Sequence, residues 1–376
     1  MKTPFQIDNT EVKIEQILLV CVDFPHIPDF DIAVAEAVEL VKAVDGHLRQ
    51  TVTCKRDKPH SALFVGTGKA EELAEMVATH KIDLVVFNHE LSAMQERNLE
   101  KVLQCRVLDR VGLILAIFAQ RAQTPEAKLQ VEAAQLTHLS ARLIRGYGHL
   151  QSQRGGIGLK GPGETQLELD RRLIGQKIAR LNKRLAEVKK NRAVQRQNRQ
   201  RNKMPVFALV GYTNVGKSTL FNALTKSEVF VKNQLFATLD TTARLLCLSP
   251  ECSIILTDTV GFVRDLPHSL IDAFSATLEE TANADILLHI IDISDKNYEE
   301  KADKVEQTLH EIGAIDIPKI KIFNKIDQIS NTKAEILRNN NGLIRAVKIS
   351  AIEPQSIELL RQALCFVANE LKGQTQ

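Results

Sequence analysis

Short apolar runs alternate with longer amphipathic segments between residues 16 and 121 of the chain. The short runs have the length and composition of strands, and the longer segments repeat their apolar residues at the spacing of one helix face. This alternation predicts a small α/β domain with a mainly parallel sheet. The expected strands are residues 17–22, 50–54, 62–65, 83–87 and 106–108, and the expected helices are residues 32–44, 69–80, 91–104 and 111–119.

Two long helical patterns follow this first domain. In each of them the apolar residues recur at spacings close to those of a coiled-coil seam. We expect the two helices to pair as an antiparallel hairpin. The seam positions are Leu129, Ala133, Leu136, Leu139 and Leu143 in the first helix, residues 125–145, and Leu167, Ile174, Ile178, Leu181, Leu185 and Val188 in the second.

The connection between the two helices, residues 146–165, holds seven of the 18 glycines and also carries Tyr147, His149, Arg154 and Lys160. So many glycines predict a mobile loop, because ordering them costs entropy. A basic loop with aromatic residues at the tip of a helical arm favours contact with folded RNA. A plain flexible linker is the alternative interpretation.

The second helix leads into a strongly basic segment, residues 171–203, which we call the basic arm. It contains 13 Lys or Arg residues and one acidic residue, Glu187. A solvated linker helix is one interpretation, but such helices normally mix both signs of charge. The imbalance therefore favours binding to a polyanion.

Alternating strands and helices return from residue 205 to about residue 372. This order predicts a doubly wound α/β domain with its site at the carboxyl ends of the strands. The expected domains are residues 1–124, 125–203 and 204–376. In the last domain the expected strands are residues 206–210, 245–248, 254–256, 286–291, 320–323 and 347–349, and the expected helices are residues 217–225, 270–281, 299–310 and 357–371.

The segment Gly211-Tyr-Thr-Asn-Val-Gly-Lys-Ser218 has the residue types and spacing of a phosphate-binding P-loop. Glycines let backbone N–H groups approach a β-phosphate, and the following helix adds the positive end of its dipole. Lys217 is expected to span the β- and γ-phosphates, and the Ser218 hydroxyl to bind Mg²⁺. The alternative is an ordinary glycine turn between a strand and a helix.

Three further motifs each follow an apolar strand-like run. Asp258-Thr-Val-Gly261 is expected to bring a carboxylate to Mg²⁺ and a glycine N–H to the γ-phosphate. In Asn324-Lys-Ile-Asp327, the Asp327 carboxylate can accept hydrogen bonds from guanine N1–H and the 2-amino group, a donor pair that adenine lacks. Ser350-Ala351 is placed to offer a backbone N–H to guanine O6. In chain order, the four motifs predict a GTP-binding domain.

Composition narrows the class of protein further. Hydrophobic residues make up 44% of the chain and charged residues 25%, and no apolar stretch reaches the length that a bilayer requires. The N-terminus has no secretory pattern, and the six cysteines are scattered, which predicts reduced thiols in the cytoplasm. The ten histidines show no metalloprotease spacing.

A second glycine-rich segment, Val65-Gly-Thr-Gly-Lys69, imitates a phosphate loop. It lacks the four-residue spacer between glycines, and Ala70 stands where a metal-binding hydroxyl is needed. We therefore favour a glycine turn that starts a helix. An additional nucleotide site, as in an RNA-remodelling ATPase, is the alternative.

Several segments together resemble the HflX family of ribosome-associated GTPases: GYTNVGKSTLFNALT, QLFATLDTT, TDTVGFVRDLPH, FNKID, LDRVGLILAIFAQRAQTPEAKLQVEAAQL and GGIGLKGPGETQLELDRR. The resemblance spans roughly residues 63–327. It implies a cytoplasmic GTPase that binds the large ribosomal subunit and its RNA, and that splits stalled ribosomes under stress. We expect a monomer without a membrane span.

Family roles carried over by position give a first switch loop at residues 236–240, with Thr238 on Mg²⁺, and a second at residues 258–261. The metal ligands are then Ser218 and Thr238, and the catalytic residues are Lys217, Thr238 and Gly261. The residues expected to bind GTP are Gly211, Tyr212, Thr213, Asn214, Val215, Gly216, Lys217, Ser218, Phe236, Ala237, Thr238, Leu239, Asp240, Asp258, Thr259, Val260, Gly261, Asn324, Lys325, Ile326, Asp327, Ser350 and Ala351.

The chain departs from the family pattern at Thr241, where many relatives have proline, so that Thr241 and Thr242 compete with Thr238 as the metal hydroxyl. The chain ends just after the last expected helix, whereas some relatives add a small C-terminal domain. Related GTPases hold K⁺ with a P-loop asparagine, which here is Asn214.

Ras-like GTPases place a water-orienting glutamine directly after the glycine of the second switch, and this chain has Phe262 there. A phenylalanine can neither orient water nor act as a base. We therefore expect slow intrinsic turnover that a partner stimulates, with the ribosome as the leading candidate. A signalling or membrane-associated GTPase is a further alternative, because the basic arm has the charge to touch anionic lipid.

Overall fold

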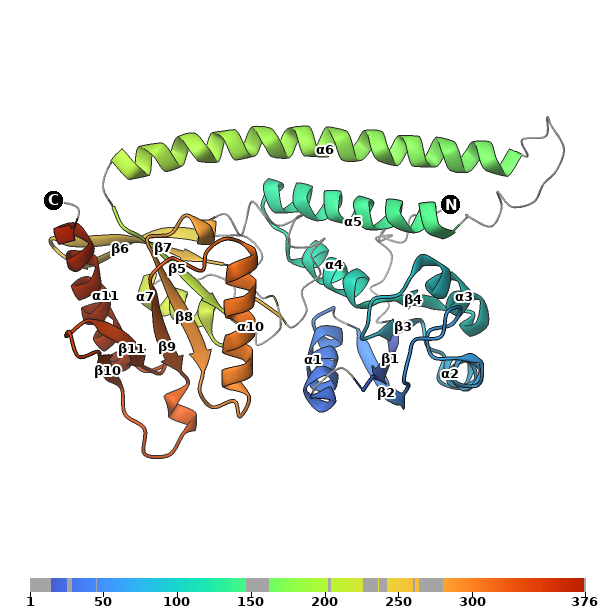
Figure 1. Cartoon of the computed structure of the whole chain (residues 1–376), viewed down its shortest axis with the longest axis horizontal. Coiled ribbons are helices and arrows are strands. Elements are labelled where there is room, and N and C mark those ends of the chain that lie inside the picture. Colours follow the sequence, from blue (N-terminus) through green and yellow to red (C-terminus); the bar gives the residue numbers. More distant parts are fainter. Residues whose placement is uncertain are drawn as a thin grey trace. The chain divides into compact units, whose positions relative to one another are not determined.

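The computed structural model describes residues 15–25, 29–44, 46–146, 162–201, 204–225, 236, 242–259, 261–263 and 280–374 (Figure 1). The chain divides into two compact units. The first comprises Met1–Ile117 with His138–Arg171, and the second comprises Phe118–Thr137 with Arg172–Gln376.

The first unit contains a four-stranded parallel sheet in the order β2-β1-β3-β4. This arrangement confirms the predicted parallel α/β domain. The strands are β1 (Gln16–Asp23), β2 (His47–Lys55), β3 (Leu84–Phe87) and β4 (Arg106–Leu108), and the helices are α1 (Phe30–Lys42), α2 (Thr67–His80), α3 (Ala93–Leu103) and α4 (Arg110–Arg121), the last of which extends into the second unit.

Helices cover both faces of this sheet, and its central strands are therefore almost entirely apolar. Leu18 and Val20 of β1 lie in one core cluster with Leu73 of α2 and Leu99 of α3. Helix α1 buries Ala37, Leu40 and Val41 and packs against β1 and β2. Figure 1 shows α1 on one side of the sheet and α2 and α3 on the other.

The strand predicted at residues 62–65 was wrong. The segment forms a tight turn in which His60 and Phe64 exchange backbone hydrogen bonds of 2.8 and 3.0 Å. Phe64 adopts a left-handed backbone conformation with φ 58°, and its buried ring meets Phe24 and Phe87 edge-on. Residues 62–65 are thus anchored by the buried Phe64 ring and do not pair as a strand of the sheet.

The glycine-rich segment at residues 65–69 is a turn that starts a helix, as we favoured. Gly66 has φ 90° and is the residue before the first turn of α2. The Lys69 ammonium forms an ion pair with Glu72, at 2.7 Å, one turn further along the same helix. This lysine is therefore engaged locally, which weakens the alternative of a second nucleotide site.

The helical hairpin consists of α5 (Pro125–Gly146) and α6 (Pro162–Arg201). In the second unit, Lys177 of α6 forms an ion pair of 2.7 Å with Glu132 of α5. The predicted seam residues Ile174, Ile178, Leu181, Leu185 and Val188 are partly or fully buried, whereas most of the positions between them are exposed.

The predicted loop at residues 146–165 was too long. Helix α6 already begins at Pro162, consistent with the preference of proline for the first helical turn, where its missing N–H has no partner to lose. The predicted mobility concerns residues 147–161, which lie outside the described residues.

The second unit contains a seven-stranded sheet in the order β10-β11-β9-β8-β5-β7-β6, in which β6 and β10 are antiparallel edge strands. The strands are β5 (Val206–Gly211), β6 (Thr242–Ser249), β7 (Cys252–Asp258), β8 (Ile286–Asp292), β9 (Lys319–Asn324), β10 (Glu335–Arg338) and β11 (Ile344–Lys348). The helices are α7 (Lys217–Thr225), α10 (Tyr298–Glu311), the single 3₁₀ turn η2 (Ile326–Gln328) and α11 (Pro354–Gln374). Strand β10 was not predicted, and most of the helix predicted at residues 270–281 lies outside the described part of the chain.

Strand β5 is the point at which the order of this sheet reverses. The chain goes from β5 to β6 and β7 on one side, and then to β8, β9 and β11 on the other. Helices α7 and α11 contact each other on one face, and α10 packs against β5 and β8 (Figure 1). Ligands of doubly wound sheets bind at the carboxyl end of such a switch point, where the chain here reaches Gly211.

Candidate functional site

The segment from Gly211 to Ser218 joins the end of β5 to the start of α7. Gly216 adopts φ 93°, and a Cβ at this residue would lie 2.4 Å from Nδ2 of Asn324. Only glycine satisfies both the dihedral angle and the close approach. The glycine is therefore required by the backbone path, as a phosphate-binding loop demands.

Lys217 is buried beneath this loop. Its ammonium donates hydrogen bonds to the carbonyl oxygens of Gly211, at 3.0 Å, and Tyr212, at 2.6 Å. Burial lowers the pKa of Lys217 to about 8, and the nearby Asp258 carboxylate opposes that shift. Binding of an anion beside this ammonium would offset the unfavourable burial of its charge.

The candidate metal ligands lie at the carboxyl edge of the sheet. The Ser218 hydroxyl donates to Oδ2 of Asp258 over 3.0 Å, and the Asp258 side chain is fully buried at the end of β7. A hydroxyl beside a carboxylate is the oxygen donor set that Mg²⁺ prefers, so the residues fit this ion. Thr238 and its competitor Thr241 lie outside the described residues, and Thr242 is the first residue of β6.

Phe262, the residue after the expected second switch, is hydrogen-bonded to the phosphate loop. Thr213 N–H donates to the Phe262 carbonyl, at 2.8 Å, and Phe262 N–H donates to the Gly211 carbonyl, at 3.2 Å. A Cβ on Gly261 would lie 2.7 Å from Cγ2 of Thr213 and 3.0 Å from Nζ of Lys217. Gly261 thus lies beside the lysine.

The remaining expected switch residues are only partly described. Thr259 donates its hydroxyl to the Leu209 carbonyl over 2.5 Å, and the buried Phe236 adopts φ 54°. The others, Ala237, Leu239, Asp240 and Val260, lie outside the part that the structure describes.

The expected guanine motif is tied to the phosphate loop by its first residue. Asn324 donates to the Val215 carbonyl over 2.8 Å and accepts from the Ala351 N–H over 3.0 Å. Ser350 donates its hydroxyl to Oδ1 of Asp327 over 2.5 Å, which fixes the orientation of that carboxylate. The structure therefore brings three segments that are distant in sequence to one edge of the sheet.

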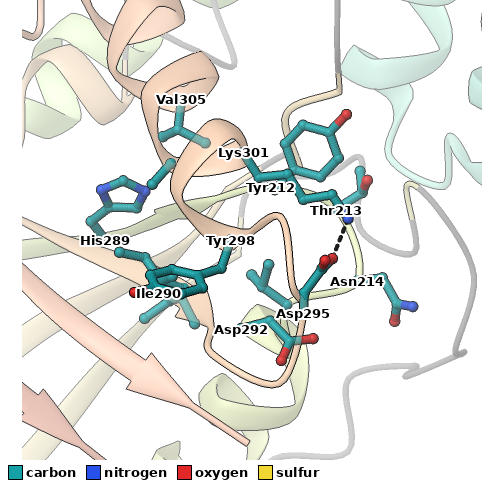
Figure 2. A pocket seen from close by; sticks show the side chains of 13 residues that line it. Tyr212, Thr213, Asn214, His289, Ile290, Asp292, Asp295, Tyr298, Lys301 and Val305 are labelled. Carbon is teal, nitrogen blue, oxygen red and sulfur yellow. Dashed lines mark hydrogen bonds and ion pairs between the residues drawn. The ribbon is translucent and has the colours of Figure 1, made fainter. Parts of the chain in front are cut away.

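Sequence reasoning missed a group of charged residues behind the loop. Asp292 and Asp295, at and after the end of β8, and Lys301 of α10 line a cavity of about 70 Å³ together with Tyr212 and Asn214 (Figure 2). The position of Asp292 at a strand end was a usable signal, because strand ends carry the other motifs. Lys301 lies inside an ordinary amphipathic helix and gave no signal.

Other features of the described residues agree with the composition. Among the helices described, none combines the length and apolarity that crossing a bilayer requires. Within the same residues, no three or more His, Cys, Asp or Glu side chains cluster as metal ligands. All six cysteines are free thiols.

Family models match three consecutive parts of the chain. A "GTP-binding GTPase N-terminal" model matches residues 31–119, and a "GTP-binding GTPase Middle Region" model matches residues 121–199. A "50S ribosome-binding GTPase" model matches residues 206–325. The last match covers the phosphate loop, the second switch and the first two residues of the guanine motif.

Curated relatives and solved structures agree with these models. The GTPase HflX of Escherichia coli (strain K12) is 48% identical over 350 residues, which is 93% of this chain and 82% of that protein. The GTPase HflX of Caldanaerobacter subterraneus subsp. tengcongensis is 44% identical, over 90% of this chain and 77% of that protein. The crystal structure of SsGBP with GDP shares the fold, with a TM-score of 0.54 at 23% identity over 95% of this chain and 99% of that one. The chain therefore belongs to the HflX family of GTPases and hydrolyses GTP.

Proposed function

We propose that this GTPase binds the large ribosomal subunit in its GTP-loaded state and dissociates stalled ribosomes into subunits. The observation that carries the proposal is the direct connection of a basic helix to a guanine-nucleotide domain. Helix α6 ends at Arg201 and β5 begins at Val206, so only a few residues join the basic arm to the strand that enters the phosphate loop. The described part of the arm exposes Arg171, Arg172, Lys177, Arg180, Lys183, Arg184 and Lys190.

We assign the nucleotide contacts as follows. The loop from Gly211 to Lys217 binds the phosphates, and Ser218 with Thr238 binds Mg²⁺, which neutralises phosphate charge during hydrolysis. Asp327 reads the guanine base, with Ser350 and Ala351 completing its pocket. Two interlocking observations support this assignment: the buried Lys217 ammonium and the oriented Asp327 carboxylate.

We also propose the domain boundaries 1–124, 125–203 and 204–376.

We further propose that K⁺ binds beside Asn214. Asn214 is an exposed residue of the loop with φ 63°. Its side chain is therefore accessible to a cation that approaches from solvent. Equal GTPase rates in sodium and potassium buffers would count against this ion.

The proposed intrinsic turnover is slow because Phe262 cannot order the attacking water. Its ring is 1% exposed, and its backbone is hydrogen-bonded to the phosphate loop on both sides. The residue is thus held as part of the core. A partner must supply water ordering or positive charge, and we expect large subunits to raise kcat by more than about tenfold.

GTP binding is expected to take up a proton at alkaline pH. Burial lowers the pKa of Lys217 to about 8, and phosphate favours the charged amine, so binding raises this pKa towards its ordinary value. At pH 7 and below, the amine is almost fully charged before and after binding, so that this group takes up almost no proton. Above pH 8 nucleotide affinity falls as pH rises. Titration calorimetry at pH 9 in two buffers of different ionisation enthalpy measures the uptake, and the same pair at pH 7 is the control.

Sucrose-gradient sedimentation with a non-hydrolysable GTP analogue tests ribosome binding and splitting. We expect the GTP-like state to comigrate with large subunits and to convert ribosomes into subunits, and the GDP state to do neither. The arm is tested with Arg180→Gln, Lys183→Gln and Arg184→Gln together. If each side chain contacts a phosphate, the slope of log affinity against log salt falls by about 3.

A matched control removes three exposed charges of the nucleotide domain, in β9, in the segment before β10 and in β11: Lys321→Gln, Lys333→Gln and Arg345→Gln. It makes the same change in net charge, and we expect affinity within twofold of the parent protein. Equal losses of ribosome affinity in the two triple variants would show that the arm acts only through the net charge of the protein. Equal association in the empty, GDP and GTP states would reject the proposed switch.

A further inference from the structure

The side of the phosphate loop that faces α10 carries a contact that the motifs do not include. The Lys301 ammonium lies 5.3 Å from the ring centroid of Tyr212, which is 7% exposed. A cation at this distance from an aromatic ring is attracted by the negative face of the ring. Figure 2 shows the Tyr212 ring and Lys301 close together at the cavity, within the second unit.

The Lys301 ammonium is itself held in place. Asp295, in the turn before α10, forms both a hydrogen bond and an ion pair with it (Figure 2). Partial burial pushes the pKa of Asp295 upward, but the hydrogen bonds from Lys301 and the Asn297 N–H, together with the positive charges of Lys301 and Lys325, outweigh that effect and leave the pKa below its ordinary value. The aspartate therefore stays ionised and anchors the lysine over the ring.

A second aspartate–lysine pair lies at the end of β8. Asp292 forms an ion pair of 2.7 Å with Lys325, and Lys325 donates to the Asn214 carbonyl over 3.0 Å. Asp292, the last residue of β8, and Asp295, just after it, thus hold two lysines against the phosphate loop. Lys325 belongs to the guanine motif, whereas Lys301 belongs to no motif.

Tyr212 matters because its backbone carries the acceptor for the catalytic lysine. The Tyr212 carbonyl accepts the shorter of the two hydrogen bonds from Lys217, at 2.6 Å, and Tyr212 also forms a β-bridge with Phe262, the residue after the second switch. A rotation of the Tyr212 peptide would move the carbonyl that aims the Lys217 ammonium. Restraining the ring restrains that peptide.

We propose that Lys301 is a positioning residue for GTP hydrolysis, acting on Lys217 through the ring and carbonyl of Tyr212. The proposal rests on the proposed role of the loop in phosphate binding. The Lys301 ammonium contacts Asp295 and the Tyr212 ring, so we assign its effect to the aim of Lys217. Misalignment affects the transition state more than the ground state, and kcat falls more than KM rises.

The test is steady-state GTP hydrolysis by the full chain with Lys301→Met, which keeps the length of the side chain and removes its charge. We expect kcat to fall by about three- to tenfold, since exposed to half-buried cation–π contacts have about this effect. KM for GTP should stay within twofold, and loss of the contacts with Asp295 and Tyr212 should lower the melting temperature by only about a few degrees. Lys301→Arg retains the cation and should restore kcat.

The ring is tested with Tyr212→Leu and Tyr212→Phe. Tyr212→Phe keeps the aromatic face, so Lys301→Met should lower kcat in the Tyr212→Phe background by the same factor as in the parent protein. Tyr212→Leu removes the face, so it should lose kcat as Lys301→Met does. The double variant Lys301→Met with Tyr212→Leu should be no slower than the slower single variant, because both changes break the same contact. Lys296→Met, an exposed lysine in the same turn, is the matched control.

Lys217→Ala is measured in parallel. It distinguishes failure of the phosphate-loop assignment from failure of the positioning role of Lys301. If it retains turnover, the phosphate-loop assignment fails. If it is inactive while Lys301→Met keeps kcat within 1.5-fold of the parent protein, only the positioning role fails. Additive losses in the double variant also overturn the positioning role, since the lysine would then act by another route.

Discussion

Asp327→Asn is expected to weaken GTP binding by about 10⁴-fold, because a site built on polar pairing rejects a base that leaves its groups unpaired. In the proposed guanine pocket, the Asp327 carboxylate would offer two acceptors to the N1–H and 2-amino donors of guanine, and Ser350 fixes its orientation through a hydrogen bond of 2.5 Å. An asparagine offers one acceptor and one NH₂ donor. The NH₂ group then faces the guanine 2-amino group, donor against donor.

The same substitution should create affinity for xanthosine triphosphate, because xanthine carries an oxygen at C2 that accepts from the asparagine NH₂ group. Competition against a fluorescent guanine nucleotide measures the loss, and direct titration with the xanthine nucleotide measures the gain. Asp316→Asn changes an exposed aspartate of the same domain and should leave both affinities unchanged. GTP affinity within tenfold of the parent protein in Asp327→Asn would show that another residue reads the base.

Much of this site could be predicted because each motif follows an apolar strand. Strands buried on both faces read as continuous apolar runs, such as Val206–Gly211, and they bring their carboxyl ends to one edge of the sheet. The order of the motifs along the chain then placed Lys217, Asp258 and Asp327 near one another without coordinates. The long seams of α5 and α6 were equally readable, since periodicity over many turns is a strong signal.

The wrong and missing predictions have a common cause. The conformation of a short apolar segment depends on the residues that it packs against, which are distant in sequence. Phe64 looked like part of a strand, but its ring fills a space between Phe24 and Phe87 and the backbone turns to deliver it. Strand β10 has only the sequence Glu-Ile-Leu-Arg, and it exists because β11 offers an antiparallel edge. The contact of Lys301 with Tyr212 depends on packing of α10 against the loop, which no local pattern encodes.

Gly216→Ala is expected to weaken guanine-nucleotide binding by roughly 100-fold, from left-handed strain on alanine combined with loss of a buried hydrogen bond. Gly216 has φ 93°, and an added Cβ would lie 2.4 Å from Nδ2 of Asn324. That nitrogen donates to the Val215 carbonyl, and the same side chain accepts from the Ala351 N–H. Relieving the clash therefore moves Asn324 and separates the phosphate loop from the guanine pocket.

The distinguishing feature of this prediction is that one methyl group disturbs both halves of the site. Affinities for GDP and for guanosine alone should both fall, because the base pocket shifts along with the loop; a defect confined to the phosphates would spare guanosine. Gly175→Ala is the matched control, since Gly175 is an exposed residue of α6 with nothing within 4 Å of an added Cβ. Replacing glycine with alanine inside a helix should leave binding unchanged and stabilise the helix by about 0.5–1 kcal/mol. Guanosine affinity equal to that of the parent protein in Gly216→Ala would mean that Asn324 does not couple the two halves.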